Sequence, residues 1–182
     1  MANITLAVTG SISAYKAAEL SNQLSKLGHH VTVLMSQSAT QFITPLTLQS
    51  LSKNLVHTDV MLEEDPSSIK HIDIAKETDL FLVAPLSANT LAKLAHGTAD
   101  NIITAVALAL PVGKPKLVAP AMNTNMYLNP ATQHNLHLLR SYGFEEIKPR
   151  EALLACGDYG TGALADIDTI LEKVRQTLHE KQ

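Results

Sequence analysis

The sequence is short of charge, aromatic rings and cysteine. Charged residues make up only 17% of its 182 residues and hydrophobic residues 46%, against roughly 25% charged residues in typical soluble domains. This deficit of charge indicates surface that is buried elsewhere, most simply in an oligomer. The single cysteine excludes an intrachain disulfide and a CxxC metal site, and it fits a reducing compartment.

The chain also lacks the charge and the long apolar runs of a nucleic-acid-binding or membrane protein. Its net charge of −3 gives no electrostatic reason to expect nucleic acid or an anionic membrane as a partner. No apolar run reaches transmembrane length, and the first residues lack the basic region of a signal peptide. We therefore expect a cytoplasmic protein without a metal site, folded as one domain over residues 1–182.

What the chain does contain is an alternation of short apolar runs with helical patterns, which predicts an α/β fold. Five strands are expected, at residues 4–9, 31–35, 80–84, 117–119 and 144–147. The expected helices carry apolar faces that include Leu20, Leu24 and Leu27; Leu91, Leu94 and Ala95; Leu136, Leu139 and Tyr142; and Ile167 to Leu178. Residues 102–110 predict a further helix, capped by Asp100 and apolar on nearly every face, whereas residues 52–70 are interpreted as a surface excursion.

Short hydroxyl and amide side chains follow several of these strands. In a parallel sheet such turns lie at the carboxyl edge, where ligands usually bind. The first turn lacks the GxGxxG fingerprint of dinucleotide-binding proteins, and Ser36 and Ser38 could hold a phosphate or cap the next helix. Asn123 could likewise grip a carboxylate or only cap backbone. The turns are Gly10-Ser11-Ile12-Ser13, Ser36 to Thr40, Pro85 to Thr90, and Pro120 to Met126.

Two reactive side chains complete the set of candidates. His71 precedes the third predicted strand, where a catalytic role and a hydrogen-bonded structural role both remain open. Cys156 is flanked by three glycines within six residues, so its loop can move or bring its backbone close to a ligand. A structural cysteine normally lies in a helix or strand core, and this placement favours a chemical role for Cys156.

Together these segments resemble the flavin-dependent cysteine decarboxylases, and within them the members that act on 4′-phosphopantothenoylcysteine in coenzyme A synthesis. The resemblance spans nearly the whole chain. It implies a single-domain, three-layer α/β/α fold with a doubly wound, mostly parallel sheet of the Rossmann or flavodoxin type. It also implies assembly as a trimer or a multiple of trimers, with FMN near the protomer interface. The segments that carry it are Gly10-Ser11-Ile12, His71, Pro85 to Thr90, Asp100-Asn101, Pro120 to Met126 and Leu154 to Asp166.

The resemblance also implies a role for individual residues. His71 would be a catalytic base or acid, Asn123 would hold the substrate carboxylate, and Cys156 would donate a proton from a mobile flap. The implied substrate contacts are Asn123, Met126, Leu153, Ala155 and Leu164. The implied FMN contacts are Gly10, Ser11, Ile12, Ser36, Ser38, Ser87, Ala88, Asn89, Thr90 and Ala121.

The implied reaction oxidises the substrate thiol to a thioaldehyde, which provides an electron sink for loss of carbon dioxide. The resulting enethiolate is then reduced to 4′-phosphopantetheine. One alternative is a peptidyl-cysteine decarboxylase that stops at the enethiol, although such relatives lack the cysteine that corresponds to Cys156. A flavin prenyltransferase would need basic side chains to bind a prenyl phosphate, and the equivalent turn, from Pro85 to Thr90, has none. The alternative from another class is a non-catalytic regulatory flavoprotein of the same fold.

Two departures from the family motifs affect these expectations. Tyr127 replaces the tryptophan that usually ends the motif beginning at Pro120, so the aromatic packing is expected to survive without any contact specific to indole. Ala163 stands where bacterial members often have arginine, and Asp166 where they have glutamate. The second departure bears on phosphate recognition rather than on the reaction.

Overall fold

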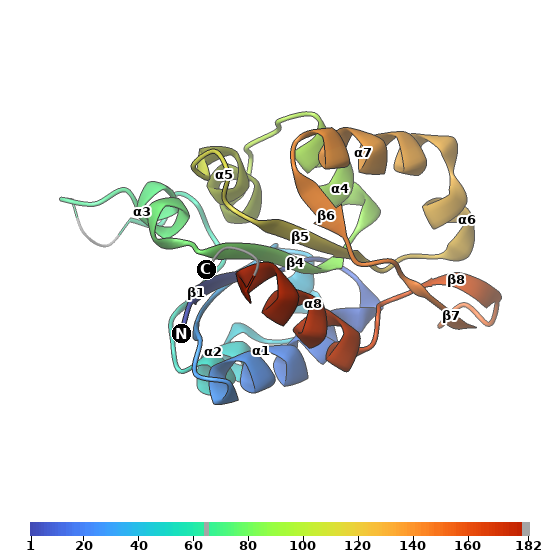
Figure 1. Ribbon diagram of the computed structural model, residues 1–182, viewed down its shortest axis with the longest axis horizontal. Coiled ribbons are helices and arrows are strands. Elements are labelled where there is room, and N and C mark those ends of the chain that lie inside the picture. Colours follow the sequence, from blue (N-terminus) through green and yellow to red (C-terminus); the bar gives the residue numbers. More distant parts are fainter. Residues whose placement is uncertain (64–65, 180–182) are drawn as a thin grey trace.

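A parallel six-stranded sheet runs through the middle of the protein (Figure 1). The computed structural model describes residues 1–63 and 66–179. The strand order is β3-β2-β1-β4-β5-β6, so the direction of winding reverses between β1 and β4. Such a reversal opens a crevice at the carboxyl ends of the two strands, where ligands bind in this class of fold. The strands are β1 Asn3–Val8, β2 His30–Met35, β3 Val56–His57, β4 Leu80–Leu86, β5 Lys116–Pro120 and β6 Phe144–Glu146.

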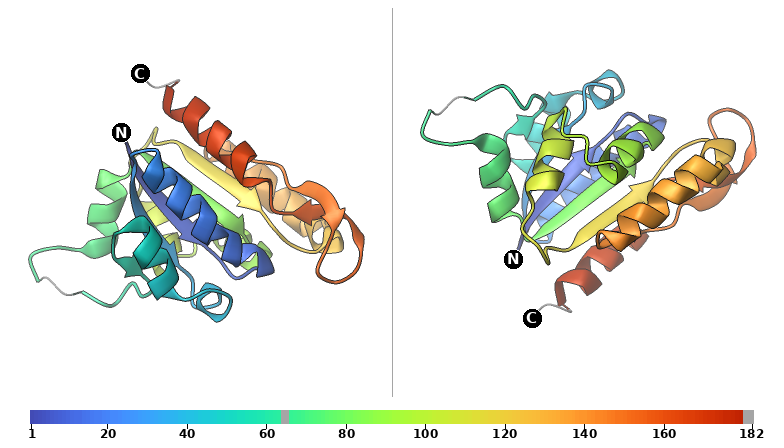
Figure 2. Two further views of the ribbon diagram at one scale, coloured as in Figure 1. Left: turned by 90° about the horizontal axis from the view of Figure 1, so that it is seen from below. Right: turned by 90° about the horizontal axis from the view of Figure 1, so that it is seen from above.

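Helices cover both faces of the sheet and give the protein three layers (Figures 1 and 2). On one face lie α1 Ala17–Lys26, α2 Pro45–Ser52 and α8 Ile167–His179; on the other lie α3 Lys70–Glu77, α4 Ala88–Ala95, α5 Ile102–Ala109 and α7 Pro130–Ser141. Successive side chains of a strand point to opposite faces. Leu6 and Val8 therefore join one buried cluster, while Ala7 joins the other.

Shorter elements lie at the turns and beyond the main sheet. These are the 3₁₀ helices Ile12–Lys16 and Ala39–Gln41, the helix α6 Thr124–Leu128, and the strands β7 Arg150–Leu153 and β8 Tyr159–Ala163. The two strands pair antiparallel as a hairpin that projects from one end of the sheet (Figure 1).

Two glycines hold this hairpin tightly against the turn that contains Asn123. The Met122 amide donates to the Gly162 carbonyl oxygen at 2.9 Å. A Cβ atom on Gly162 would lie 2.2 Å from the Met122 carbonyl oxygen, and one on Gly160 would lie 2.6 Å from Thr124 Oγ1. The glycines at 160 and 162 therefore permit close packing of the hairpin. Mobility of the loop around Cys156 stays a prediction.

The predicted α/β fold is confirmed, with differences in detail. The sequence interpretation missed β3 because two residues at a sheet edge are too few to show a period, and it missed β7 and β8 because glycine and alanine interrupt their pattern. Asn101, rather than Asp100, caps α5. Leu27 and Tyr142 were expected on buried helix faces, but their side chains are more than half exposed, because both residues follow the last turn of their helices.

Candidate active site at the carboxyl edge of the sheet

Buried hydrogen bonds join the turns that follow β1, β4 and β5. The Thr9 hydroxyl donates to the Pro85 carbonyl oxygen at 2.7 Å and accepts from the Ser87 amide at 2.8 Å. The Ala121 amide donates to the Leu86 carbonyl oxygen at 3.0 Å. Because Thr9 is completely buried, its hydroxyl fixes the end of β1 against the turn that leads into α4.

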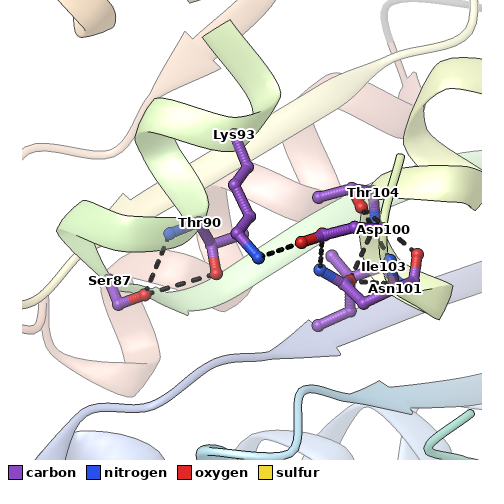
Figure 3. A network of polar contacts seen from close by, with 7 residues as sticks. All are labelled: Ser87, Thr90, Lys93, Asp100, Asn101, Ile103 and Thr104. Carbon is purple, nitrogen blue, oxygen red and sulfur yellow. Dashed lines mark hydrogen bonds and ion pairs between the residues drawn. The ribbon is translucent and has the colours of Figure 1, made fainter. Parts of the chain in front are cut away.

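A helix cap and an ion pair also fix the N-terminal part of α4, which begins after Ser87. Ser87 caps α4, since its hydroxyl accepts from the Thr90 amide at 3.3 Å. Lys93 of the same helix forms an ion pair with Asp100 in the loop before α5 (Figure 3). Asn101 next to it accepts from the amides of the first turn of α5, in a capping box completed by Thr104. These caps orient α4 and the residues at its N-terminus.

The joined turns and the hairpin enclose a cavity of about 500 Å³. It opens at the carboxyl ends of β1 and β4, where the sheet topology predicts a ligand site. The structure brings twelve of the residues predicted from the sequence into its wall. They are Gly10, Ser11, Ile12, Ser87, Ala88, Ala121, Asn123, Met126, Leu153, Ala155, Cys156 and Leu164.

Asn123 and Cys156 meet in this cavity although 33 residues separate them in the sequence. The Asn123 side-chain amide donates to Cys156 Sγ at 3.3 Å, and the Cys156 thiol donates to Asp158 Oδ2 at 3.4 Å. Asn123 also caps α6, because its Oδ1 accepts from the Asn125 amide at 2.8 Å. The structure therefore shows the backbone cap made by the side-chain oxygen, while the nitrogen faces the thiol; the grip on a carboxylate stays a prediction.

Five predicted residues lie outside the lining of the cavity. One of them, His71, is on an element that contributes no residue to the cavity wall. It belongs to α3, which lies away from the β7–β8 hairpin in all three views (Figures 1 and 2). Its Nδ1 is buried and has no hydrogen-bond partner among the described residues. Asn89 and Thr90 directly follow the lining residues Ser87 and Ala88, whereas the turn from Ser36 to Thr40 contributes no lining residue. Ser38 packs against Gly10, because a Cβ atom added to Gly10 would lie 2.5 Å from the Cβ atom of Ser38.

The cavity also has lining residues that the sequence interpretation did not single out. Lys16 and Arg150 contribute its charged side chains, and Tyr15 and Phe42 contribute its aromatic ones. One signal could have identified Lys16, because it lies three residues after Ser13 and one helical turn returns it to the same face. Arg150 has no comparable local signal, since only the hairpin pairing brings it to the cavity.

A larger hollow, of about 1000 Å³, lies between α4, α5 and α7. It contains none of the predicted site residues. Its Lys116 ammonium donates to the Tyr142 carbonyl oxygen at 2.6 Å and lies 4.8 Å from the centre of the Phe144 ring. Burial lowers the pKa of Lys116. We take the smaller cavity as the candidate active site because Cys156, Asn123 and ten further predicted residues line it.

Tyr127, one of the two departures from the motif, has a specific contact of its own. Its ring is 9% exposed, and its hydroxyl donates to Glu146 Oε1 at 2.8 Å. Burial, followed by the hydrogen bond and charge of Glu146, raises the pKa of Tyr127 to about 12. Arg140 pairs with the other oxygen of the same carboxylate. The aromatic packing is thus retained, and the phenol adds a link between α6 and the end of β6.

The described residues contain no cluster of three or more His, Cys, Asp or Glu side chains able to hold a metal ion. In the same part of the chain, every helix is too short or too polar to cross a membrane.

Comparison with known proteins agrees with the fold and identifies relatives of the chain. A Streptococcus mutans protein described as a probable phosphopantothenoylcysteine decarboxylase is 64% identical over 96% of this chain and 98% of its own. The coenzyme A biosynthesis bifunctional protein CoaBC of Bacillus subtilis is 42% identical over 98% of this chain, which spans 44% of that protein's length.

Solved structures give the same result. A phosphopantothenoylcysteine (PPC) decarboxylase mutant complexed with pantothenoylaminoethenethiol matches with a TM-score of 0.90 and 34% identity, over 98% of both chains. The FMN-binding protein AtHal3 matches with a TM-score of 0.88 and 35% identity, over 100% of this chain and 98% of the other.

The sequence profile of the Flavoprotein family matches residues 1–179. This match covers the sheet, both helical layers and every residue that lines the cavity. The chain therefore belongs to the Flavoprotein family, and its cofactor is a flavin.

Proposed function

We propose that this protein decarboxylates 4′-phosphopantothenoylcysteine to 4′-phosphopantetheine with FMN as its cofactor, in the cytoplasm. The contact between the Asn123 amide and the Cys156 thiol carries this proposal. It places a group that can hold a carboxylate beside a group that can supply a proton. The similarity to the Streptococcus mutans protein, over nearly the full length of both chains, supports the same substrate.

The cavity wall fits FMN in size and in chemistry. A volume of about 500 Å³ lies within the roughly 300–1000 Å³ typical of sites for small ligands and cofactors. Hydroxyls of Ser11 and Ser87 and the ammonium of Lys16 suit a phosphate and a ribityl chain, while Ile12 and Ala121 supply apolar surface. When bound, FMN supplies the reversible hydride transfer on which decarboxylation of an amide-linked cysteine depends.

The protein's own residues then have separate tasks. Asn123 holds the substrate carboxylate and so fixes the cysteine portion of the substrate. Correct positioning of the reacting group can lower the activation free energy substantially. Cys156 keeps a proton in the cavity for the final step, in which the enethiolate carbon is protonated. Met126, Leu153, Ala155 and Leu164 surround the remainder of the substrate and exclude water.

His71 enters this scheme through assembly. We propose a homotrimer, or a multiple of trimers, in which His71 of one protomer faces the cavity of another and acts as base or acid. Two observations support it. Within the chain, α3 lies away from the β7–β8 hairpin, whose residues line the cavity (Figure 1), and Ile69, two residues before His71, is an apolar residue that is 56% exposed. The helix α5, predicted to be apolar on nearly every face, buries residues 102–106 within the protein itself, so these residues are not available to a partner subunit.

The alternative of a peptidyl-cysteine decarboxylase has support from the structural likeness to the peptidyl-cysteine decarboxylase EpiD, with a TM-score of 0.79 and 28% identity. That reaction ends at the enethiol. The position of Cys156 in the cavity wall, in contact with Asn123, favours the complete reaction instead.

Replacing the thiol with a hydroxyl of similar size separates the two halves of the reaction. We expect Cys156→Ser to release carbon dioxide for about one turnover and to yield the enethiol, because serine is a far weaker acid. His71→Ala and Asn123→Ala should each lower carbon dioxide release by roughly 10²–10⁴-fold. The measurement is an oxygen-free single-turnover reaction analysed for carbon dioxide and for thiol products by mass spectrometry. Normal formation of 4′-phosphopantetheine by Cys156→Ser would contradict the role of the thiol.

A further inference from the structure

The charges in the cavity wall differ in sign from those of the whole protein. The chain carries a net charge of −3, yet the charged side chains that line the cavity are Lys16 and Arg150, and no carboxylate is among the lining residues. Two cations beside a low-dielectric wall attract anions into the space between them. The cavity is thus suited to a ligand with more than one anionic group.

Lys16 and Arg150 occupy different parts of this wall. Lys16 ends the 3₁₀ helix that follows the Gly10–Ser13 turn, on the side that we assign to the cofactor. Arg150 begins β7 in the hairpin, beside residues 152–156 of the same wall. The two cations are therefore placed to meet two different anionic groups.

The Arg150 side chain is oriented before any ligand arrives. Its Nε donates to the Leu164 carbonyl oxygen at 3.2 Å and lies 3.1 Å from Asp166 Oδ1. Among residues 1–63 and 66–179, its two terminal nitrogens have no hydrogen-bond partner. A guanidinium fixed through Nε presents those nitrogens as a fork, which matches two oxygens of a phosphate. Across the hairpin Arg150 pairs with Ala163, whose methyl group leaves space beside the guanidinium.

Arg150 and Cys156 lie toward opposite ends of β7. A strand rises about 3.3 Å per residue, so Arg150 lies roughly 10 Å from Leu153, and the loop with Cys156 extends farther. The substrate carries its carboxylate at one end of an extended chain and its phosphate at the other. With the carboxylate at Asn123, the phosphate end reaches along β7 toward its first residue.

We propose that Arg150 binds the phosphate of the substrate and makes the protein specific for the phosphorylated form. This inference rests on the proposed function and names the residue that distinguishes 4′-phosphopantothenoylcysteine from its dephosphorylated analogue. Arg150 is a binding residue in this scheme and takes no part in proton transfer.

The test compares the binding of 4′-phosphopantetheine and pantetheine by titration calorimetry to the purified, flavin-loaded protein. In Arg150→Met, the preference for the phosphorylated ligand should fall by roughly 10- to 100-fold, because charge-assisted hydrogen bonds are lost, while pantetheine binds as before. Arg150→Lys should restore part of the preference, since the charge returns without the fork.

Three control variants separate this role from a structural one. Lys148→Met removes the same charge two residues away at an exposed position and should keep the preference. Asp166→Asn removes the ion-pair partner of Arg150 but keeps its guanidinium, so the preference should again survive. Lys16→Met should lower flavin retention without changing the ratio of the two affinities.

The outcomes also separate this inference from the proposed function. A preference that survives in Arg150→Met overturns the role of Arg150 and leaves the proposed function standing. Equal weakening of both ligands in Arg150→Met and Asp166→Asn assigns Arg150 a structural role and overturns the inference. Loss of the preference in Lys16→Met alone transfers phosphate binding to Lys16. If the unmodified protein binds neither ligand and releases no carbon dioxide from the substrate, the proposed function fails as well.

Discussion

Removal of the Thr9 hydroxyl should destabilise the protein and disorganise the cofactor side of the site. Thr9→Val keeps the shape of the side chain but leaves the Pro85 carbonyl oxygen and the Ser87 amide without their partner. An unpaired buried polar group costs about 1–3 kcal/mol, and the Ser87 amide is only partly buried, so we expect the free energy of unfolding to fall by about 2–4 kcal/mol. The turn into α4 should also shift, and the purified variant should contain less flavin.

Thr5→Val, at a buried position within β1, provides the matched control. Thr5 is also buried, but its hydroxyl meets only the Thr78 hydroxyl, at 2.7 Å, and Thr78 also donates to the Ile74 carbonyl oxygen at 2.6 Å. Its removal orphans no backbone group, and we expect a loss of about 1 kcal/mol with normal flavin content. Urea denaturation of the flavin-free proteins, with the slope compared as well as the midpoint, measures both losses. A loss for Thr9→Val no larger than that for Thr5→Val would refute the bridging role of Thr9.

Three further predictions follow from single contacts. Gly162 and Gly157 both have positive φ, so alanine strains the backbone at either position. Only at Gly162 does the added Cβ also clash, since it would lie 2.2 Å from the Met122 carbonyl oxygen, whereas at Gly157 it meets nothing within 4 Å. Limited proteolysis should therefore cut the hairpin much faster in Gly162→Ala than in Gly157→Ala. The pKa of Tyr127 is raised to about 12 in the folded protein, against about 10 for tyrosine in the unfolded chain. The protonated phenol therefore contributes its full stabilisation at pH values below about 10. That contribution disappears as the pH rises toward 12, so urea titrations should show the advantage over Tyr127→Phe shrinking across this range, and a constant difference would contradict it. Asn89→Ala, if this side chain contacts the cofactor, should lower the flavin content of a folded protein measured by absorbance, and full retention would remove it from the site.

The sequence by itself determined the features that depend on neighbours along the chain. Apolar runs such as 80–84 and 117–119 predicted buried parallel strands, because both faces of such strands are covered. Asn129 caps α7 and Pro130 is its first residue, a start that depends only on residues within one turn. The motifs around Asn123 and Cys156 identified the chemistry, because reactive residue types in turns have few structural reasons to be there.

Only the tertiary structure decided which of these segments meet. The Thr9 hydroxyl reaches Pro85 and Ser87 across 76 and 78 residues, and Arg150 reaches the cavity through a hairpin whose small residues hide its period. The sequence around His71 also did not indicate that α3 contributes no residue to the cavity of its own chain. Local patterns specify which face of an element is buried, but strand order and helix docking are set by the summed burial of the whole core. For that reason, the neighbours of a polar side chain can be known only once the core is packed.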